Sequence, residues 1–125
     1  MSDILRKVQE AGLEISKLAP EVGVSETLVR QIKQGTRQAN GHSKEIERSI
    51  LQRARRLLSF NPTRENFLDV LQECNIRKTA LAKRLGVTYQ ALDSASINGM
   101  SEKLADRIKQ GIRELGQDLL EAVRA

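Results

Sequence analysis

Aromatic side chains are almost absent from this chain of 125 residues, which contains one tyrosine, two phenylalanines and no tryptophan. Proteins that bind single-stranded DNA or RNA usually stack the bases on exposed aromatic rings. Phe60, Phe67 and Tyr89 are too few to build such a platform. If the chain binds a nucleic acid, its composition therefore favours duplex DNA.

Cysteine and histidine are equally scarce, because Cys74 and His42 are the only examples. A single cysteine cannot form a disulfide within the chain, which is compatible with a reducing compartment. One cysteine and one histidine far apart in the sequence are too few for a metal centre. The sequence therefore predicts neither a bound metal nor another cofactor.

Long apolar segments are missing as well. No stretch approaches the roughly 18 apolar residues that a membrane-spanning helix needs. The first residues also lack the basic start and apolar run of a secretory signal. We therefore expect a cytoplasmic protein without a membrane partner.

Signals of catalysis are also lacking. No serine has a neighbouring histidine to act as its base, and no G-x-x-x-x-G-K segment offers a phosphate-binding loop. A tyrosine or serine recombinase would need an arginine and histidine constellation that this sequence does not contain. We expect a protein that is not an enzyme.

Basic residues, in contrast, are in excess and give a net charge of +5 at pH 7. Residues 1–60 contain 11 basic and 7 acidic side chains, whereas residues 61–125 contain 10 and 9. A basic surface attracts polyanions such as nucleic acids. The first half is therefore the better candidate for DNA binding.

The stretch from Ile15 to Gln34 has the spacing of two helices joined by a tight turn. Ala19 is small where two helices must approach closely, and Gly23 stands where the turn requires a positive φ. Ser25 can accept a hydrogen bond from the first turn of the second helix. Apolar residues recur where both helices would face one core: Leu18, Val22, Val24, Val29 and Ile32.

This pattern recurs 63 residues later in the chain. The two copies agree at the small residue, the turn glycine and the capping residue, which chance is unlikely to produce. We therefore expect two tandem domains, residues 1–58 and residues 59–125. The aligned pairs are Leu18 and Leu81, Ala19 and Ala82, Gly23 and Gly86, Val24 and Val87, Ser25 and Thr88, and Val29 and Leu92.

The remaining sequence predicts helices only, because the alternation typical of strands persists nowhere. We therefore expect an all-α protein. A short first helix is expected from Ser2 to Ala11, and a long final helix from Ser101 to about Val123. The residues expected at the starts of other helices are Ser16, Ser43 and the pair Asn61 and Pro62.

Both copies resemble the lambda-repressor/Cro class of helix-turn-helix domains, which are compact bundles of four to five helices. The resemblance is carried by LAPEVGVSETLVRQIKQG followed by HSKEIERSI, and by LAKRLGVTYQALDSASING followed by MSEKLADRI. The second copy is also similar to Fis-type segments through NIRKTALAKRLGVTYQAL. The resemblance implies two tandem small helical bundles and sequence-specific binding of double-stranded DNA. A bacterial, phage or plasmid transcriptional regulator, either repressor or activator, would have this function.

In the first copy, burial of Val29 and Ile32 would turn the polar side chains of the second helix outward. A helix in the major groove presents such side chains to the base edges, and the alternative is a solvated face. Arg30 can donate two hydrogen bonds to guanine, and a glutamine can pair with adenine. The expected base contacts are Glu26, Thr27, Arg30, Gln31 and Gln34. The expected phosphate contacts are Ser25, Lys33, Arg37 and Lys44.

The second copy offers Tyr89 and Gln90 as base contacts and Thr88 as a phosphate contact. However, Asp93 stands where Arg30 stands in the first copy, and phosphates repel a carboxylate. Two interpretations stay open for this copy, contact with DNA and contact with a protein.

The final helix carries an apolar stripe whose last turns have little of their own domain to cover. One interpretation is a homodimer formed through Leu115, Leu119 and Val123, and the other is packing within the chain.

Two other functions remain as alternatives to a specific regulator. An anti-activator that reuses the fold to bind a regulator protein or RNA polymerase is favoured by Asp93 and the nearly neutral second half. A non-specific architectural or partition accessory would bind DNA with steep salt dependence and little sequence preference.

Overall fold

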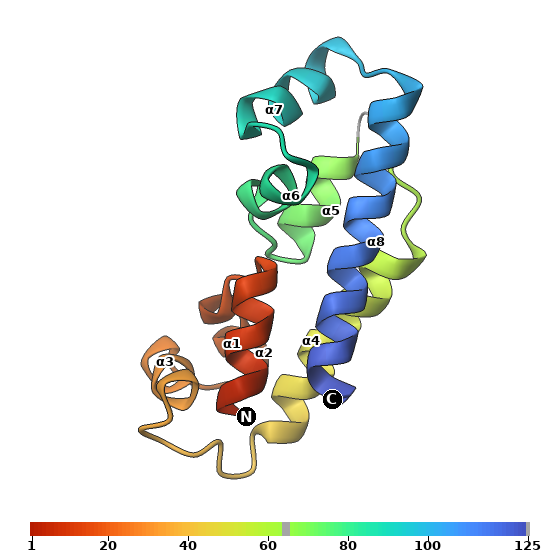
Figure 1. Cartoon of the computed structure of the whole chain (residues 1–125). Helices are drawn as coiled ribbons and strands as arrows, with labels where there is room; N and C mark the ends of the chain where they lie inside the picture. Colours follow the sequence, from red (N-terminus) through yellow and green to blue (C-terminus); the bar gives the residue numbers. More distant parts are fainter. Residues whose placement is uncertain (64–65, 125) are drawn as a thin grey trace.

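The computed structural model of the chain describes residues 1–63 and 66–124 (Figure 1). Within these residues the chain forms eight α-helices, one short 3-10 helix and no strand, so the prediction of an all-α protein is confirmed. The helices of the first half are α1 (Ser2–Ala11), η1 (Ile15–Lys17), α2 (Leu18–Val22), α3 (Glu26–Gln34) and α4 (Ser43–Ser59). Those of the second half are α5 (Phe67–Glu73), α6 (Lys78–Leu85), α7 (Tyr89–Asn98) and α8 (Glu102–Arg124).

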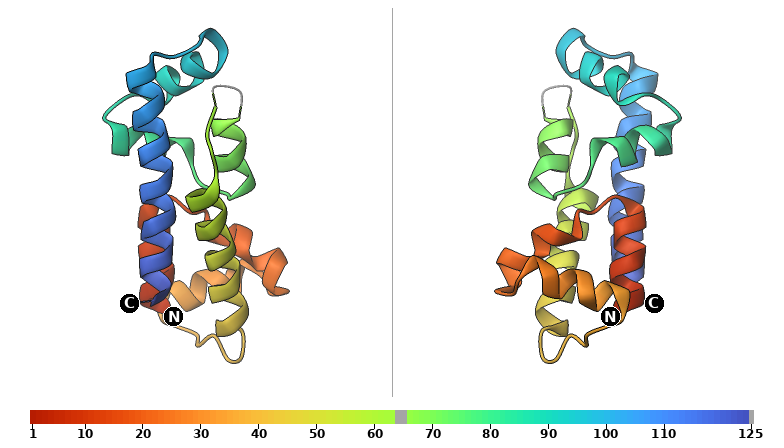
Figure 2. Two further views of the ribbon diagram at one scale, coloured as in Figure 1. Left: turned by 90° about the vertical axis from the view of Figure 1, so that its right-hand side faces the viewer. Right: turned by 90° about the vertical axis from the view of Figure 1, so that its left-hand side faces the viewer.

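The two longest helices, α4 and α8, lie side by side and run in opposite directions (Figures 1 and 2). Gly116 permits this close approach, because a Cβ added there would lie 3.0 Å from the carbonyl oxygen of Ala54 and from side-chain atoms of Leu57 and Leu58. The facing surfaces of both helices are apolar and fully or almost fully buried. These side chains are Ile46, Ile50, Ala54 and Leu57 in α4, and Ile108, Ile112, Leu115 and Leu119 in α8.

The second half of α8 packs against the first half of the chain. It contacts α1 as well as α4, and the buried residues of both halves form one apolar cluster. Leu115 and Leu119 are 0% exposed and Val123 is half-buried. Of the two interpretations of this stripe, the structure therefore has packing within the chain, and Leu115 and Leu119 are not free to contact a second copy.

The two halves meet at equivalent residues. Leu13 and Ile76, which are 63 positions apart, form an isolated antiparallel bridge. The backbone N–H of Glu14 donates to the carbonyl oxygen of Asn75 at 2.9 Å, and the N–H of Arg77 donates to the carbonyl oxygen of Gly12 at 3.0 Å. Glu14 and Arg77 are equivalent positions, and so are Gly12 and Asn75, so each half donates one hydrogen bond and accepts one at equivalent positions. This reciprocity is the mark of an approximate twofold rotation that relates the two halves.

Two predicted helix caps, Ser25 and Thr88, are present, and Ser101, predicted as the first residue of the final helix, is a third cap. The side-chain oxygen of each accepts a hydrogen bond from a backbone N–H three residues later, at 3.1 Å. These caps fix the starts of α3, α7 and α8.

Three other predicted helix caps are wrong, although α4 does begin at Ser43. Ser16 lies inside η1 because Pro20 has no N–H to donate to its carbonyl group, so a regular helix does not begin there. Ser43 is already the first residue of α4, because the carbonyl group of His42 accepts from the N–H of Ile46 at 3.0 Å. Asn61 and Pro62 lie outside any helix, because α4 ends at Ser59, Phe60 is extended, and α5 begins only at Phe67.

A buried arginine fixes α2 to α4 and links both to the second half. The side chain of Arg53 is only 6% exposed, and its two terminal nitrogens each donate to the carboxylate of Glu21 at 2.8 Å. Its Nε donates to the carbonyl oxygen of Cys74 at 3.0 Å, and Nη2 donates to Oδ1 of Asn75 at 2.8 Å. Ser49 completes the cluster, since its hydroxyl bonds to both Glu21 and Arg53. Arg53 is thus a structural residue that joins the segment carrying α3 to the other half.

Replacement of Arg53 by methionine should lower the free energy of unfolding by about 2–3 kcal/mol. The loss should stay below the upper range for broken buried ion pairs, because Glu21 is 47% exposed and can be rehydrated. The carbonyl group of Cys74 and the amide of Asn75 would nevertheless lose a donor. Urea denaturation measures the effect. Arg55→Met, at an exposed position of the same helix, is the control and should change stability by less than about 0.5 kcal/mol. Equal effects of the two substitutions would contradict the role given to Arg53.

Protonation of the Glu21 carboxylate should lower the stability of the protein in acid. Hydrogen bonding from Arg53 lowers the pKa of Glu21 below its ordinary value, although partial burial opposes the shift. Because folding lowers this pKa, the stabilisation is present above the unfolded-state pKa of about 4.5 and is lost as the pH falls through the folded-state pKa. Urea midpoints measured between pH 7 and pH 3 should fall more steeply for the wild type than for Glu21→Gln. Parallel curves would show that Glu21 does not contribute.

Candidate nucleic-acid interface

Helix α3 is attached to the rest of the protein along one side. Val29 and Ile32 are each 1% exposed, and the helix packs against α1, η1 and α2. Its C-terminal end is held by α1, because the carbonyl oxygen of Lys33 accepts from the hydroxyl of Ser2 at 2.5 Å and from Nε of Arg6 at 3.3 Å. These contacts leave the opposite side and the N-terminal turn of α3 facing solvent.

The turn before α3 has the conformation that its sequence predicts. Gly23 adopts φ 79°, in the left-handed region, and ends α2. Ser25 is extended, and its Oγ accepts from the N–H of Leu28. Because a hydroxyl that accepts one bond can still donate another, Ser25 retains a proton to offer to a phosphate.

Most of the predicted contacts in the first half lie on the exposed surface of α3 and the segment that follows it. Gln31 and Lys33 are only half-buried, since they border the side of the helix that faces the core. The backbone carbonyl group of Gln31 is used to close the helix, because it accepts from Thr36. The exposed members of the predicted set are Ser25, Glu26, Thr27, Arg30, Gln34, Arg37 and Lys44.

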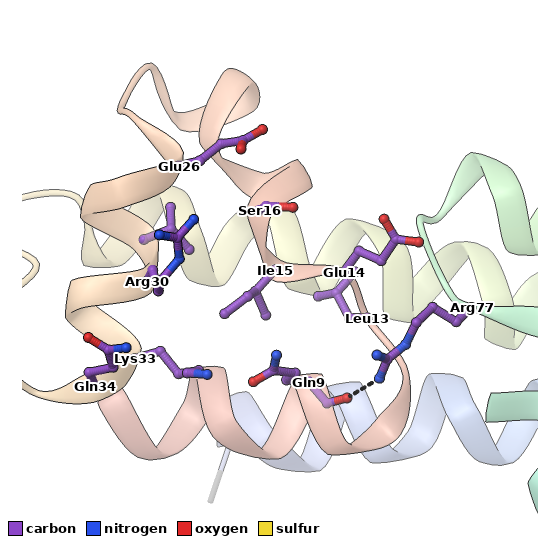
Figure 3. A pocket seen from close by; sticks show the side chains of 11 residues that line it. Gln9, Leu13, Glu14, Ile15, Ser16, Glu26, Arg30, Lys33, Gln34 and Arg77 are labelled. Carbon is purple, nitrogen blue, oxygen red and sulfur yellow. Dashed lines mark hydrogen bonds between the residues drawn. The ribbon is translucent and has the colours of Figure 1, made fainter. Parts of the chain in front are cut away.

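A shallow groove of about 290 Å³ separates α3 from η1 and the end of α1 (Figure 3). Arg30 and Lys33 line this groove from α3, and Arg77 enters it from the second half. The guanidinium of Arg77 donates to the carbonyl oxygen of Gln9 at 3.2 Å. The carboxylates of Glu14 and Glu26 also line the groove, so three cations stand against two anions. The sequence pattern indicated neither Glu14, which precedes η1, nor Arg77, which reaches the groove only through the contact between the halves.

Helix α7 occupies the equivalent place in the second half. Gly86, with φ 70°, ends α6, and Thr88 caps α7. Leu92 and Ala95 face the core, whereas Gln90 is exposed and Tyr89 and Ile97 are 43% and 74% exposed. The predicted contacts of the second copy therefore lie at the surface. Ile97, which was not among the predicted base contacts, lies there as well.

The negative charge of Asp93 has a local partner. Nζ of Lys78 lies 2.9 Å from both carboxylate oxygens of Asp93 and 5.3 Å from the centre of the Tyr89 ring. The comparison of the two halves gives no hint of a role for Lys78, because its equivalent in the first half is Ile15. The pair is exposed and adds little stability, but it balances the charge that Asp93 brings to α7. The surface of α7 is therefore close to neutral, whereas that of α3 is basic.

The two residues considered for metal binding do not form a reactive site. Burial raises the pKa of the Cys74 thiol to about 11, so the thiol is protonated and unreactive at neutral pH. His42 precedes the first residue of α4. Across residues 1–63 and 66–124, no three histidine, cysteine or acidic side chains are placed to hold a metal ion. In the same part of the chain, no helix combines the length and the apolar character needed to cross a membrane.

Comparison with protein-family models, with curated proteins and with solved structures found no match to this chain.

Proposed function

We propose that this protein is a sequence-specific double-stranded DNA-binding transcriptional regulator of the tandem helix-turn-helix type, in which α3 is the recognition helix. The observation that supports the proposal most strongly is the setting of α3. A capped helix follows a left-handed glycine turn, is anchored by Val29 and Ile32, and leaves Arg30 and Gln34 exposed. A helix of this kind fits the major groove, which is about 12 Å wide.

Each exposed side chain of α3 has a role that its chemistry allows. The planar guanidinium of Arg30 would donate to O6 and N7 of guanine, and the amide of Gln34 would pair with adenine. Lys33, Arg37 and Lys44 would neutralise phosphates, which raises affinity and carries no sequence information. The carboxylate of Glu26 can accept from the amino group of cytosine. The mixture of Arg30 and Glu26 on one turn favours discrimination among sequences over general attraction to DNA.

A second candidate function is an anti-activator that binds a regulator protein or RNA polymerase through α7. The exposure of Tyr89 and Ile97 on a nearly neutral helix favours it, because such residues are typical of protein interfaces. This function predicts a stable protein complex and only weak binding to DNA.

Substitution of Arg30 by alanine should weaken specific binding by about 1–3 kcal/mol and relax the preference at one base pair. Sequencing of randomised duplexes retained by the protein at physiological salt would measure both effects. Arg113→Ala is the matched control, because it removes the same charge from an exposed position on α8. We expect the control to recover the same motif as the wild type.

Each outcome of this selection separates the candidates. Recovery of one motif with both variants would exclude the role of Arg30. Recovery of duplexes without any motif would favour the architectural accessory. No recovery at all would favour the anti-activator.

A further inference from the structure

The two halves of the chain are arranged like the two subunits of a symmetric dimer. The reciprocal bonds between Gly12–Glu14 and Asn75–Arg77 join equivalent residues, as a twofold axis requires. The antiparallel pair α4 and α8 satisfies the same rotation, because each helix is the equivalent of the other. In a regulator that acts as a dimer, such an axis would relate two separate chains. Here it lies within one chain.

This rotation places α3 and α7 at opposite ends of the molecule on the same side. α3 leads into the first residue of α4, and α7 leads into the first residue of α8. Since α4 and α8 are antiparallel, their first residues lie at opposite ends of the pair. Figure 1 shows α3 and α7 both to the left of α8, and the right-hand view of Figure 2 looks onto that side.

The length of α8 matches one turn of DNA. α8 contains 23 residues, and at 1.5 Å per residue it is about 34 Å long. α7 lies beside the first end of α8 and α3 lies near the level of its last turns (Figure 1). Successive major-groove segments on one face of a duplex are also about 34 Å apart. The α4 and α8 pair is therefore a spacer of the right length between two such segments.

The spacer is rigid because polar and apolar contacts cross between the halves. Arg53 of the first half is bonded to Cys74 and Asn75 of the second. The end of α8 is buried against α1 and α4. Any DNA site that engages α3 and α7 together must therefore have one fixed spacing.

The two helices would read different sequences. α3 presents Arg30 and Glu26, whereas α7 presents Gln90 and the exposed aliphatic side chain of Ile97. Ile97 can contact the methyl group of thymine, and Gln90 can pair with adenine. The bond between Lys78 and Asp93 removes the repulsion that would otherwise keep phosphates from α7.

We infer that a single copy of this chain binds one asymmetric operator, with α3 in one major-groove segment and α7 in the next, at a half-site rich in A·T pairs. This inference rests on the proposed function. If each chain used only one recognition helix, two copies would instead bind together to a symmetric palindrome, one on each half-site.

The experiment begins with the duplex selected by the wild-type protein. Sedimentation equilibrium should give one protein per duplex, and hydroxyl-radical footprinting should show two protected segments one helical turn apart on one face. The double substitution Gln90→Ala and Ile97→Ala should weaken binding roughly tenfold and relax the base preference within one segment. Arg30→Ala should relax the preference at one base pair of the other segment. Gln117→Ala, an exposed position on α8, is the control for the glutamine substitution and should change nothing.

Insertion of base pairs between the two segments tests the rigid spacing. Five added base pairs turn the second segment to the opposite face of the duplex. We expect binding to fall at least to the level of the Gln90 and Ile97 double variant, and ten added base pairs should not restore it. Full binding to either lengthened duplex would overturn the fixed spacing, and with it the inference.

The outcomes distinguish this inference from the proposed function. If the wild-type protein selects no motif, both fail. If it selects a motif that depends on Arg30 but binds as two copies to a palindrome, only the inference fails. If one copy binds and the Gln90 and Ile97 substitutions have no effect, the inference also fails, because α7 does not contact the DNA.

Discussion

The close packing of α4 against α8 is the contact on which the rest of the structure depends. Leu5 and Val8 of α1 are fully buried, and α1 packs against α8 as well as against α3 and η1. Gly116 lets α8 approach the backbone of α4 closely, which places the end of α8 beside α1. α3 rests in turn on α1, so the candidate interface is positioned by a helix that begins 68 residues after α3 ends.

The shared arrangement of the halves does not extend to their interior chemistry. Arg53 lies ten residues after Ser43 in α4, and Gly111 lies ten residues after Ser101 in α8. At the first position a buried guanidinium binds Glu21 and the other half. At the second, a Cβ would lie 2.9 Å from the side chain of Leu81 and 3.1 Å from that of Leu85, so a glycine lets α6 pack closely there. One junction is polar and the other is apolar, although the backbones correspond.

Much of this structure could be predicted from local sequence. The glycine turns, the caps at Ser25 and Thr88, and the apolar spacing of α3 and α7 depend on residues within one or two helical turns. What could not be predicted are contacts between distant segments. Leu115 and Leu119 form an apolar stripe whichever partner covers it, so their periodicity could not tell an internal partner from a second chain. Lys78 and Arg77 were missed for a similar reason, because their functional neighbours lie across a turn or in the other half. The starts of η1 and α5 were misplaced because the backbone of Pro20 and the extended path after Phe60 outweighed the presence of a capping residue.

The burial of Leu115 and Leu119 within the chain also determines how the stability of the fold depends on protein concentration. In a two-chain protein whose core is shared between subunits, the melting temperature falls as the protein is diluted. Here the same kind of shared core is closed by a covalent connection through residues 59–66, so its formation is a first-order process. The paired arrangement of α3 and α7 is consequently maintained at any concentration, including that of a protein present in only a few copies per cell.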